Sequence, residues 1–125
     1  MIQSIGVIMI KNMKNIIKDT KAFLLDLDGT VYLDNDLIGN VKETLNILRD
    51  KGIKIVYLTN NSSKTDDEYL VKLKNLDIWD DRDIFYSSLD GTVDYIAENI
   101  PNSKVYAVAT EKVKAYLKDK INNGK

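Results

Sequence analysis

Short apolar runs alternate with helical patterns along most of this 125-residue chain, and this alternation limits the fold more than any other feature. The β-rich runs are 21–27, 53–59, 84–88 and 104–110. Apolar residues recur at helical spacing in later stretches, which are 40–52, 60–77, 87–100 and 111–121. Strands that alternate with helices form βαβ units, in which the strands are parallel. The sequence therefore predicts an α/β fold with a Rossmann-like parallel sheet.

The ends of the predicted helices carry local signals. Asn40 is suited to cap the start of the first helix, and Gly52 to stop it. Pro101 ends the third helix. Residues 28–39 are rich in Gly, Asp and Asn and predict a loop, whereas 13–20 predict a short helix or a lead-in to the first strand.

The chain has no cysteine and no histidine, which narrows the chemistry it can perform. Disulfides, thiolate nucleophiles, imidazole bases and zinc sites built from Cys or His are excluded. Any catalysis must use carboxylates, hydroxyls, lysines, amides or backbone N–H groups. Such hard oxygen ligands favour Mg²⁺ or Ca²⁺ over zinc or copper.

Charge and hydropathy predict a cytoplasmic protein with neither a nucleic-acid nor a membrane partner. The net charge is −1, so no bulk field attracts a polyanion. No segment approaches the roughly 20 apolar residues that span a bilayer. The apolar start at 1–10 lacks a basic region and a small-residue cleavage site, so no signal peptide is expected. Met9 and Met13 offer alternative starts, and 1–20 is predicted to be an N-terminal extension.

Two carboxylates meet at the end of the first predicted strand, where the sequence reads DLDGT. Asp26 and Asp28 are two residues apart, so in an extended chain their side chains point to the same side, and Leu27 points away. Two carboxylates aimed into one crevice repel each other unless a cation or a proton lies between them. Gly29 lets the backbone turn sharply and approach a ligand closely.

The second predicted strand ends in TNNSS, at the same sheet edge. Thr59, followed by backbone N–H groups that enter a helix, is suited to bind an anion. Asp26 could then attack a phosphoryl group while Asp28 transfers protons. The same residues also suit a turn cap and a helix N-cap, and the spacing alone leaves both interpretations open.

The segments FLLDLDGTVY and IVYLTNNSS resemble motifs I and II of the haloacid dehalogenase superfamily. The Tyr after the first motif, TNNSS and the later IFYSS are similar to its NagD-like, nitrophenylphosphatase-type branch, over about residues 20 to 120. The resemblance implies that Asp26 is the nucleophile and a Mg²⁺ ligand. It implies that Asp28 is the general acid and base, with its carbonyl also on Mg²⁺, and that Thr59 and the Asn60 N–H hold the phosphate. The implied substrate is a small phosphorylated metabolite.

Later family motifs, a lysine and an acidic pair, have no counterpart here. The acidic run at 77–83 follows no apolar strand and predicts a solvated turn, and the lysines of 111–121 predict a solvated helix face. We therefore expect a truncated protein: an extension at 1–20, the N-terminal half of the family core at 21–100, and the start of a cap at 101–125. In the family the first strand is central, so here one of its edges would be open.

These expectations leave several functions in view. A truncated phosphatase would have weak or no independent activity, and would self-associate or be complemented by a C-terminal half. The alternative is a non-catalytic phosphate-binding or interaction module. A phospho-acceptor receiver domain fits less well, because no Asp ends the third predicted strand.

The pentapeptide LDGTV occurs twice, at 27–31 and at 89–93. In the second copy Ser88 stands where Asp26 stands in the first, so there is no carboxylate pair. Ser87 and Asp90 are instead spaced as a capping box at a helix start. We therefore predict chemistry for the first copy and helix capping for the second.

Overall fold

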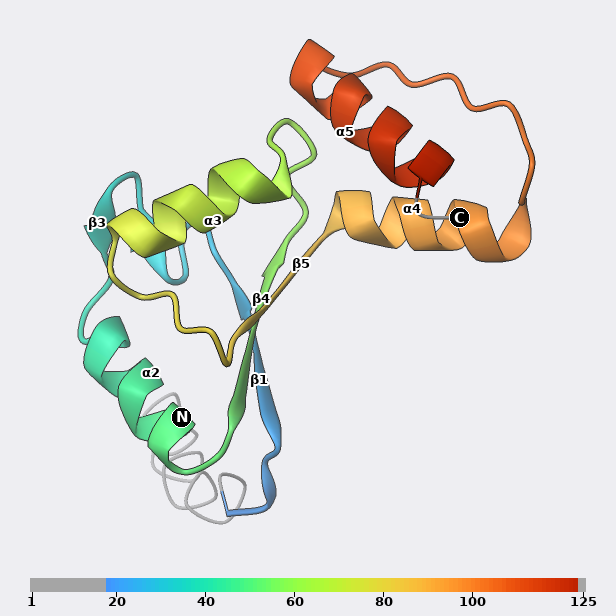
Figure 1. Ribbon diagram of the computed structural model, residues 1–125. Helices are drawn as coiled ribbons and strands as arrows, with labels where there is room; N and C mark the ends of the chain where they lie inside the picture. The colour runs from blue at the N-terminus through green and yellow to red at the C-terminus, as the bar shows by residue number, and fades with distance from the viewer. Residues whose placement is uncertain (1–17, 124–125) are drawn as a thin grey trace, which may run out of the picture.

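The computed structural model describes residues 18–123, and its centre is a three-stranded parallel sheet (Figure 1). The strands are β1 (Ala22–Asp26), β4 (Lys54–Thr59) and β5 (Ile84–Ser87), in the order β1-β4-β5. β1 pairs with β4 and β4 with β5, both in parallel. The predicted α/β class and parallel sheet are confirmed.

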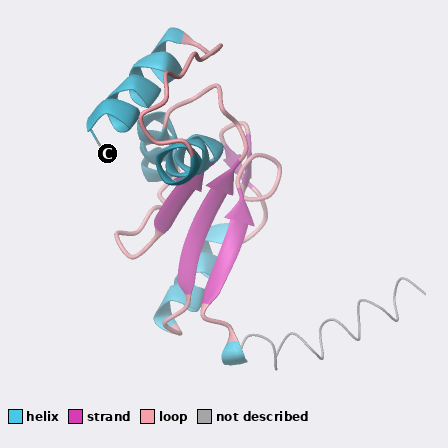
Figure 2. Ribbon diagram, turned by 90° about the vertical axis from the view of Figure 1, so that its right-hand side faces the viewer, coloured by secondary structure: helices cyan, strands magenta, loops and turns pink. Residues whose placement is uncertain are grey.

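Two helices, α2 (Val41–Asp50) and α3 (Asp66–Asn75), cover one face of this sheet. The main core lies between them and the sheet, and its fully buried side chains include Leu45, Ile55, Tyr57 and Leu73. Alternate strand residues face away from these helices, which gives the exposure pattern of β1 and β4 its period of two. Figure 2 looks onto this second face: a helix is seen end-on at the tips of the strands, and no helix of the described residues crosses the rest of the face.

α2 ends as predicted but begins differently. Gly52 has φ of 76°, and its N–H bonds to the Arg49 carbonyl at 2.9 Å. The N–H of Ile53 reaches the Leu48 carbonyl at 3.1 Å, which completes a glycine-terminated helix end. Asn40 occupies the N-cap position, but its side chain makes no capping hydrogen bond, so its predicted capping role is not realised.

The predicted loop at 28–39 contains a small antiparallel hairpin. Its strands are β2 (Tyr32–Leu33) and β3 (Asp36–Leu37), joined through Asp34 at φ of 53°. Strands of two residues are too short to show a periodic pattern, which is why the sequence did not reveal them. The hairpin matters because Tyr32, at its start, is completely buried in the main core.

α3 begins at Asp66, six residues later than the stretch predicted from 60. Thr65 caps it through a capping box: the Thr65 N–H bonds to Glu68 Oε2 at 2.9 Å. Residues 60–65 are therefore a loop between β4 and α3. The several polar residues that suggested an early cap stabilise this loop instead.

The last two helices, α4 (Ser88–Asn99) and α5 (Glu111–Asn123), pack on each other beyond the carboxyl end of the sheet (Figure 1). They share a second, smaller hydrophobic cluster formed by Leu89, Val93, Val113 and Leu117. Ser87 caps α4 with Asp90, as predicted: the Ser87 N–H bonds to Asp90 Oδ2 at 2.8 Å.

The fourth strand, predicted at 104–110, is not formed. This segment runs as an extended loop in which Tyr106 and Val108 are each 93% exposed. A β-rich sequence becomes a strand only where a neighbour pairs with its backbone, and within 18–123 no strand lies beside this segment. The sheet therefore has three strands rather than four.

The acidic run at 77–83 is only partly the solvated turn that we predicted. Asp83 is 8% exposed and pairs with Arg49, which is 6% exposed, through two hydrogen bonds of 2.7 and 2.9 Å. Arg49 also donates to the Ile78 carbonyl at 2.7 Å. The error arose because the partner of Asp83 lies 34 residues away on α2, and local sequence cannot show such a pair.

The helix or lead-in predicted at 13–20 falls mostly outside the described residues, of which Lys18 and Asp19 are helical. The other predicted segment boundaries, at 20 and 100, remain predictions. Among residues 18–123, no helix combines the length and the apolar character that crossing a membrane requires.

Candidate active site at the carboxyl ends of the strands

The three parallel strands end next to one another, and their last residues define the candidate site. Asp26 ends β1, Thr59 ends β4 and Ser87 ends β5. Asp26 lies opposite Leu58 in the sheet register, and Thr59 lies opposite Ser87. The carboxyl edge of a parallel sheet is where α/β proteins bind ligands.

A pocket of about 350 Å³ opens at this edge. It is lined by Asp26, Leu58, Thr59, Asn60, Tyr86, Ser87, Ser88 and Gly91. Three of the four predicted site residues, Asp26, Thr59 and Asn60, therefore lie together in one hollow. Asp26 and Asn60 are exposed, whereas Thr59 is 6% exposed and forms part of the floor.

Asp28, the fourth predicted site residue, does not line this pocket. Leu27 is fully buried and the next residue, Asp28, is exposed, so the chain turns toward solvent after the end of β1. Gly29 makes this turn with φ of 81°, a left-handed conformation that favours glycine. The Tyr69 hydroxyl of α3 donates to Asp28 Oδ2 at 3.4 Å and holds that carboxylate on the α3 side.

Tyr32 lies buried near both carboxylates. Its hydroxyl is buried, and no hydrogen-bond partner for it exists among residues 18–123. Burial raises the pKa of Tyr32, and the charges of Asp28, Tyr69 and Asp26 raise it further. Both carboxylates thus contribute to raising the pKa of Tyr32, Asp28 more than Asp26, although only Asp26 lines the pocket.

Tyr69 is a site residue that sequence reasoning missed, because its position on α3 indicated only a core side chain. It is 2% exposed and its ring stacks on Phe85 at 5.5 Å. Burial raises the pKa of the Tyr69 hydroxyl, the nearby Thr59 side chain opposes this rise, and the Asp28 carboxylate adds to it. The hydroxyl therefore lies between a predicted proton donor and a predicted phosphate ligand.

The predicted anion-binding segment after Thr59 forms a loop rather than the start of a helix. The Asn61 N–H donates to Thr59 Oγ1 at 3.1 Å, and the Ser63 N–H donates to Asn61 Oδ1 at 2.9 Å. Because α3 begins only at Asp66, its N-terminus does not follow Thr59 directly. The first turn of α3 also holds three acidic residues, which already offset its dipole. The N-terminus of α3 is therefore not the anion site, and the donors that remain are in the loop after Thr59 and at the start of α4.

The oxygen ligands that Asp26 and Asp28 offer are of the type that Mg²⁺ prefers, but they are few. Asp26 and Asp28 offer exposed carboxylate oxygens, the ligand type that Mg²⁺ prefers. Within 18–123, no group of three or more acidic, His or Cys side chains is placed to hold a metal ion. Mg²⁺ keeps several waters and binds phosphate oxygens readily, so two carboxylates suffice for a weak site completed by water or substrate.

None of the residues that line this pocket is basic. A phosphoryl group there would meet hydroxyls, an amide and backbone N–H groups, but no Lys or Arg from the lining. Ser88 adds an unpredicted hydroxyl: it lines the pocket, and its side-chain oxygen is buried without a partner among the described residues. The sequence signal for Ser88 was weak, since it reads as the first residue of a helix.

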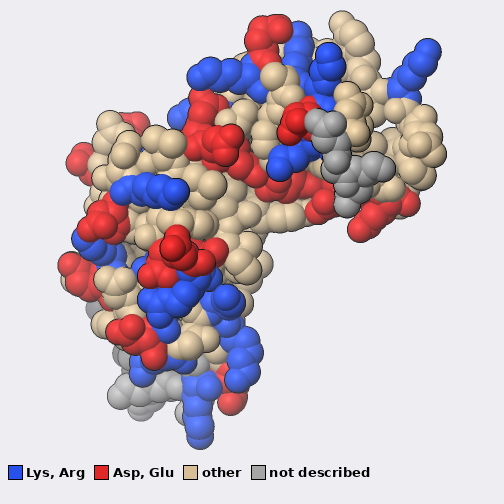
Figure 3. Space-filling model, in the orientation of Figure 1, with Lys and Arg blue, Asp and Glu red and all other residues tan. Residues whose placement is uncertain are grey.

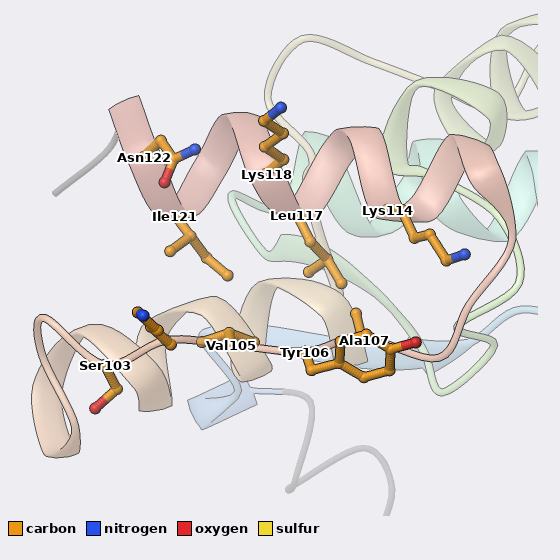
Figure 4. A pocket seen from close by; sticks show the side chains of 10 residues that line it. Ser103, Val105, Tyr106, Ala107, Lys114, Leu117, Lys118, Ile121 and Asn122 are labelled. Carbon is orange, nitrogen blue, oxygen red and sulfur yellow. The ribbon is translucent and has the colours of Figure 1, made fainter.

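A larger hollow, of about 700 Å³, lies elsewhere, between α5 and the loop at 103–107 (Figure 4). Leu117 and Ile121 point into it from α5, toward the loop that carries Val105 and Ala107. Its charged lining residues are Lys104, Lys114 and Lys118. It contains no carboxylate and none of the predicted site residues, so we do not assign the chemistry to it.

Comparison with known proteins agrees with this geometry. Residues 23–120 match the haloacid dehalogenase-like hydrolase family. An acid sugar phosphatase of Staphylococcus aureus is 40% identical over 89 residues, which cover 71% of this chain and 34% of that protein. The chain belongs to the haloacid dehalogenase-like hydrolases.

Comparison with solved structures indicates the branch of the family to which the chain is most similar in fold. A 4-nitrophenylphosphatase from Thermotoga maritima superposes with a TM-score of 0.76 at 28% identity, over 82% of this chain and 40% of that one. A hypothetical protein from Pyrococcus horikoshii OT3 gives 0.67 at 31% identity, over 77% and 38%. These neighbours, with a putative NagD protein at 0.75, identify the NagD-like branch. The chain spans about a third of the length of the curated relatives it matches.

Proposed function

We propose that the chain carries part of the active site of a Mg²⁺-dependent phosphomonoester hydrolase that works through an aspartyl-phosphate. The observation that carries this proposal is the pocket that brings Asp26 together with Thr59 and Asn60. Family membership and the phosphatase names of the relatives support it. The substrate class is a small phosphorylated metabolite, and the expected location is the cytoplasm.

In the first step, an Asp26 carboxylate oxygen attacks phosphorus and the bond to the ester oxygen breaks. Asp28 gives its proton to the departing alkoxide, which leaves as the alcohol. The Thr59 hydroxyl and the Asn60 N–H hold phosphoryl oxygens in the pocket while the P–O bond is exchanged. The phosphoryl group is now an acyl phosphate on Asp26.

In the second step, Asp28 takes a proton from water and the resulting hydroxide attacks the same phosphorus. The bond between phosphorus and the Asp26 oxygen breaks, which restores the Asp26 carboxylate and releases inorganic phosphate. The hydrogen bond from Tyr69 orients Asp28 throughout. Mg²⁺, held by Asp26 and Asp28, would supply the positive charge that this exchange needs.

The proposed activity of residues 1–125 alone is weak or absent. Two carboxylates are few ligands for Mg²⁺, and the lining of the pocket contains no cation to offset the phosphoryl charge. A complementing C-terminal segment would have to supply both. Until it does, the transition state lacks much of its electrostatic stabilisation.

The test is phosphorylation of Asp26. The chain is incubated with Mg²⁺ and a small phosphomonoester, quenched in acid, and its peptides are analysed by mass spectrometry. We expect a slow, Mg²⁺-dependent phosphate adduct that Asp26→Asn removes and that the matched control Asp36→Asn, an exposed carboxylate on β3, retains. Rapid turnover abolished by Asp26→Asn would confirm the chemistry but refute the weak activity. An adduct that persists in Asp26→Asn would refute the assignment.

The second candidate function is non-catalytic phosphate binding or an interaction module. The absence of a basic residue from the pocket lining argues against efficient catalysis, and it leaves any phosphate to be held by hydroxyl, amide and backbone donors. Calorimetry with inorganic phosphate and Mg²⁺ distinguishes the two: binding without any adduct on Asp26 supports the module, and an adduct supports the enzyme.

A further inference from the structure

Tyr32 combines complete burial with a hydroxyl that has no partner. Its side chain is 0% exposed in the main core, within the lobe whose surface carries charged side chains of both signs (Figure 3). The hydroxyl oxygen is buried without a hydrogen-bond partner among residues 18–123. Such a group is rare, because a buried hydroxyl without a partner has lost its bonds to water and gained none. A phenylalanine would fill the same space without this cost, so packing alone does not explain the hydroxyl.

A partner for this hydroxyl must come from a group that already lies beside it, because the ring is enclosed by packed side chains of the core. The turn after β1 brings Tyr32 back against Asp28. The two residues form an isolated β-bridge, and the Gly29 N–H donates to the Tyr32 carbonyl at 2.8 Å. The Lys72 ammonium lies 4.0 Å from the centre of the Tyr32 ring and holds the ring from α3. Backbone and ring are thus both fixed beside the proposed proton donor.

The charges around the hydroxyl indicate which neighbour is the partner. Burial raises the pKa of Tyr32, and among the nearby groups the Asp28 carboxylate raises it most, ahead of Tyr69 and Asp26. Asp26 lines the pocket, and Tyr69 already donates its own proton to Asp28. A phenol with a raised pKa keeps its proton at neutral pH, so the Tyr32 hydroxyl remains able to donate a hydrogen bond. Asp28 is the neighbour best suited to accept it.

Asp28 itself is held by a single weak contact. The Tyr69 hydroxyl lies 3.4 Å from Asp28 Oδ2, which is long for a hydrogen bond between two oxygens. Among residues 18–123, no other hydrogen bond to this carboxylate is found, although a carboxylate can accept about four. The side chain is exposed and has room to turn. A small rotation that brings Asp28 Oδ1 to the Tyr32 hydroxyl would satisfy the buried hydroxyl and add a second anchor to the carboxylate.

We propose that Tyr32 is a positioning residue whose hydroxyl donates to Asp28, so that two tyrosines each hold one oxygen of the acting carboxyl group. The inference rests on the proposed phosphatase function and adds a residue to it. In its acid form, Asp28 has a carbonyl oxygen and a hydroxyl. A donor held on the carbonyl oxygen leaves the hydroxyl proton free to move to the departing alkoxide. Tyr32 keeps its own proton in both steps and acts only through Asp28.

The test compares two phosphoryl donors that need Asp28 to different extents. An alkyl phosphomonoester loses an alkoxide, which must be protonated, whereas acetyl phosphate loses acetate, which leaves without a proton. Acid quench and mass spectrometry measure the rate of Asp26 phosphorylation with each donor. We expect Tyr32→Phe to slow the reaction of the alkyl ester about tenfold, the effect of one lost hydrogen bond, and that of acetyl phosphate by less than about twofold.

Tyr57→Phe is the matched control. Tyr57 is also completely buried in the main core, but its hydroxyl donates to the Ile78 carbonyl at 2.9 Å. This variant should lower Tm and leave the ratio of the two rates unchanged. Tyr32→Phe should change the ratio without lowering Tm, since its hydroxyl has no bond to lose in this structure. Adding Tyr32→Phe to Tyr69→Phe should multiply their separate losses with the alkyl ester, because each tyrosine donates to Asp28 independently.

The outcomes separate the inference from the function on which it rests. If the unmodified chain forms no adduct on Asp26 with either donor, the phosphatase function fails and the inference fails with it. If the adduct forms and Tyr32→Phe leaves the ratio of the rates unchanged, the inference alone is overturned. A Tm lowered as much as by Tyr57→Phe, with that ratio unchanged, would assign the hydroxyl a structural role. No further loss when Tyr32→Phe is added to Tyr69→Phe would overturn the direct bond to Asp28.

Discussion

The two LDGTV segments have the same five residues and opposite structural roles. In both, the Leu and the Val are buried, Leu27 and Val31 in the main core and Leu89 and Val93 in the second cluster. The residues between them differ completely in their surroundings. At 27–31 the chain leaves a strand and turns through Gly29 at φ of 81°, whereas 89–93 lies inside α4.

The difference shows that the two copies share only the burial of their Leu and Val, which are four residues apart. The pentapeptide does not by itself specify a turn or a helix. The preceding residue decides the rest: Asp26 ends a strand that is paired with β4, while Ser88 is the first residue of a capped helix. In the first copy, Asp28 accordingly accepts a hydrogen bond from the Tyr69 hydroxyl. In the second copy, Asp90 caps the start of a helix. Four predictions test this contrast, from the largest expected effect to the smallest.

The two aspartates should differ most in chemistry. Asp28→Asn is expected to slow phosphorylation of Asp26 by an alkyl phosphate about 10²–10⁴-fold, because the leaving oxygen loses its proton donor. Asp90→Asn should leave that rate within a factor of about three, a bound that rests on its capping role being worth only about 1 kcal/mol. Acid-quenched mass spectrometry over a time course measures both rates. Equal losses in the two variants would contradict the separation of roles.

The two leucines should differ in stability. Leu27→Ala is expected to lower the free energy of unfolding by about 3–5 kcal/mol, because Leu27 is fully buried among the residues of the main core. Leu89→Ala should cost about 2 kcal/mol, since its cluster is small and closer to solvent. Urea unfolding followed by circular dichroism gives both values. A larger loss for Leu89→Ala would mean that the second cluster is the stronger one.

The two glycines should respond with opposite signs. Gly29→Ala is expected to destabilise the fold by about 1–2 kcal/mol, because an L-residue is strained at this positive φ. Gly91→Ala should stabilise α4 by about 0.5–1 kcal/mol, since Ala is the better helix former. Its new Cβ would lie 3.6 Å from the Tyr86 hydroxyl, an ordinary contact. Thermal unfolding measures both, and the same sign for both variants would refute the contrast.

Asp90 also takes part in a pH effect on stability, through its neighbour Asp66. Burial raises the pKa of Asp66, and its neighbour Asp90 raises it further; the Tyr116 hydroxyl joins both, at 2.8 and 2.9 Å. A carboxyl whose folded-state pKa is raised binds its proton more tightly when folded, so stability falls as pH rises above about 4. Asp66→Asn should therefore gain stability at neutral pH and little at pH 3. Denaturant titrations at both values provide the measurement, and an equal gain at both would argue against this cause.

Sequence patterns located most elements because each is encoded locally. The strands at Ala22–Asp26 and Lys54–Thr59 are apolar runs, and Leu45 and Leu48 follow helical spacing to the core. The failures share a different cause. The segment 104–110 has the composition of a strand, but no strand among the described residues pairs with it. Asp83 was predicted to be solvated, whereas in the fold it is buried in an ion pair with Arg49 of α2. Both outcomes depend on what lies nearby in space rather than along the chain.

The candidate site was predictable to the same extent. Asp26, Thr59 and Asn60 meet in one pocket because parallel strands bring their carboxyl ends to one edge, a rule that applies before any coordinates are known. Tyr69 and Ser88 could not be found in this way. Their hydroxyls reach the site from α3 and from the start of α4, and only the packing of these helices brings them there.

The sequence by itself determined the α/β alternation and the family, and it supplied the prediction of which residues carry phosphoryl chemistry, because periodicity and strand-end motifs are local properties of the chain. The tertiary structure alone decided which copy of LDGTV turns and which continues as a helix. It also decided that α2 and α3 cover the same face of the sheet, and that Arg49 pairs with Asp83 in the interior. Burial, pairing and exposure are relations between distant segments, and these relations exist only once the chain has folded.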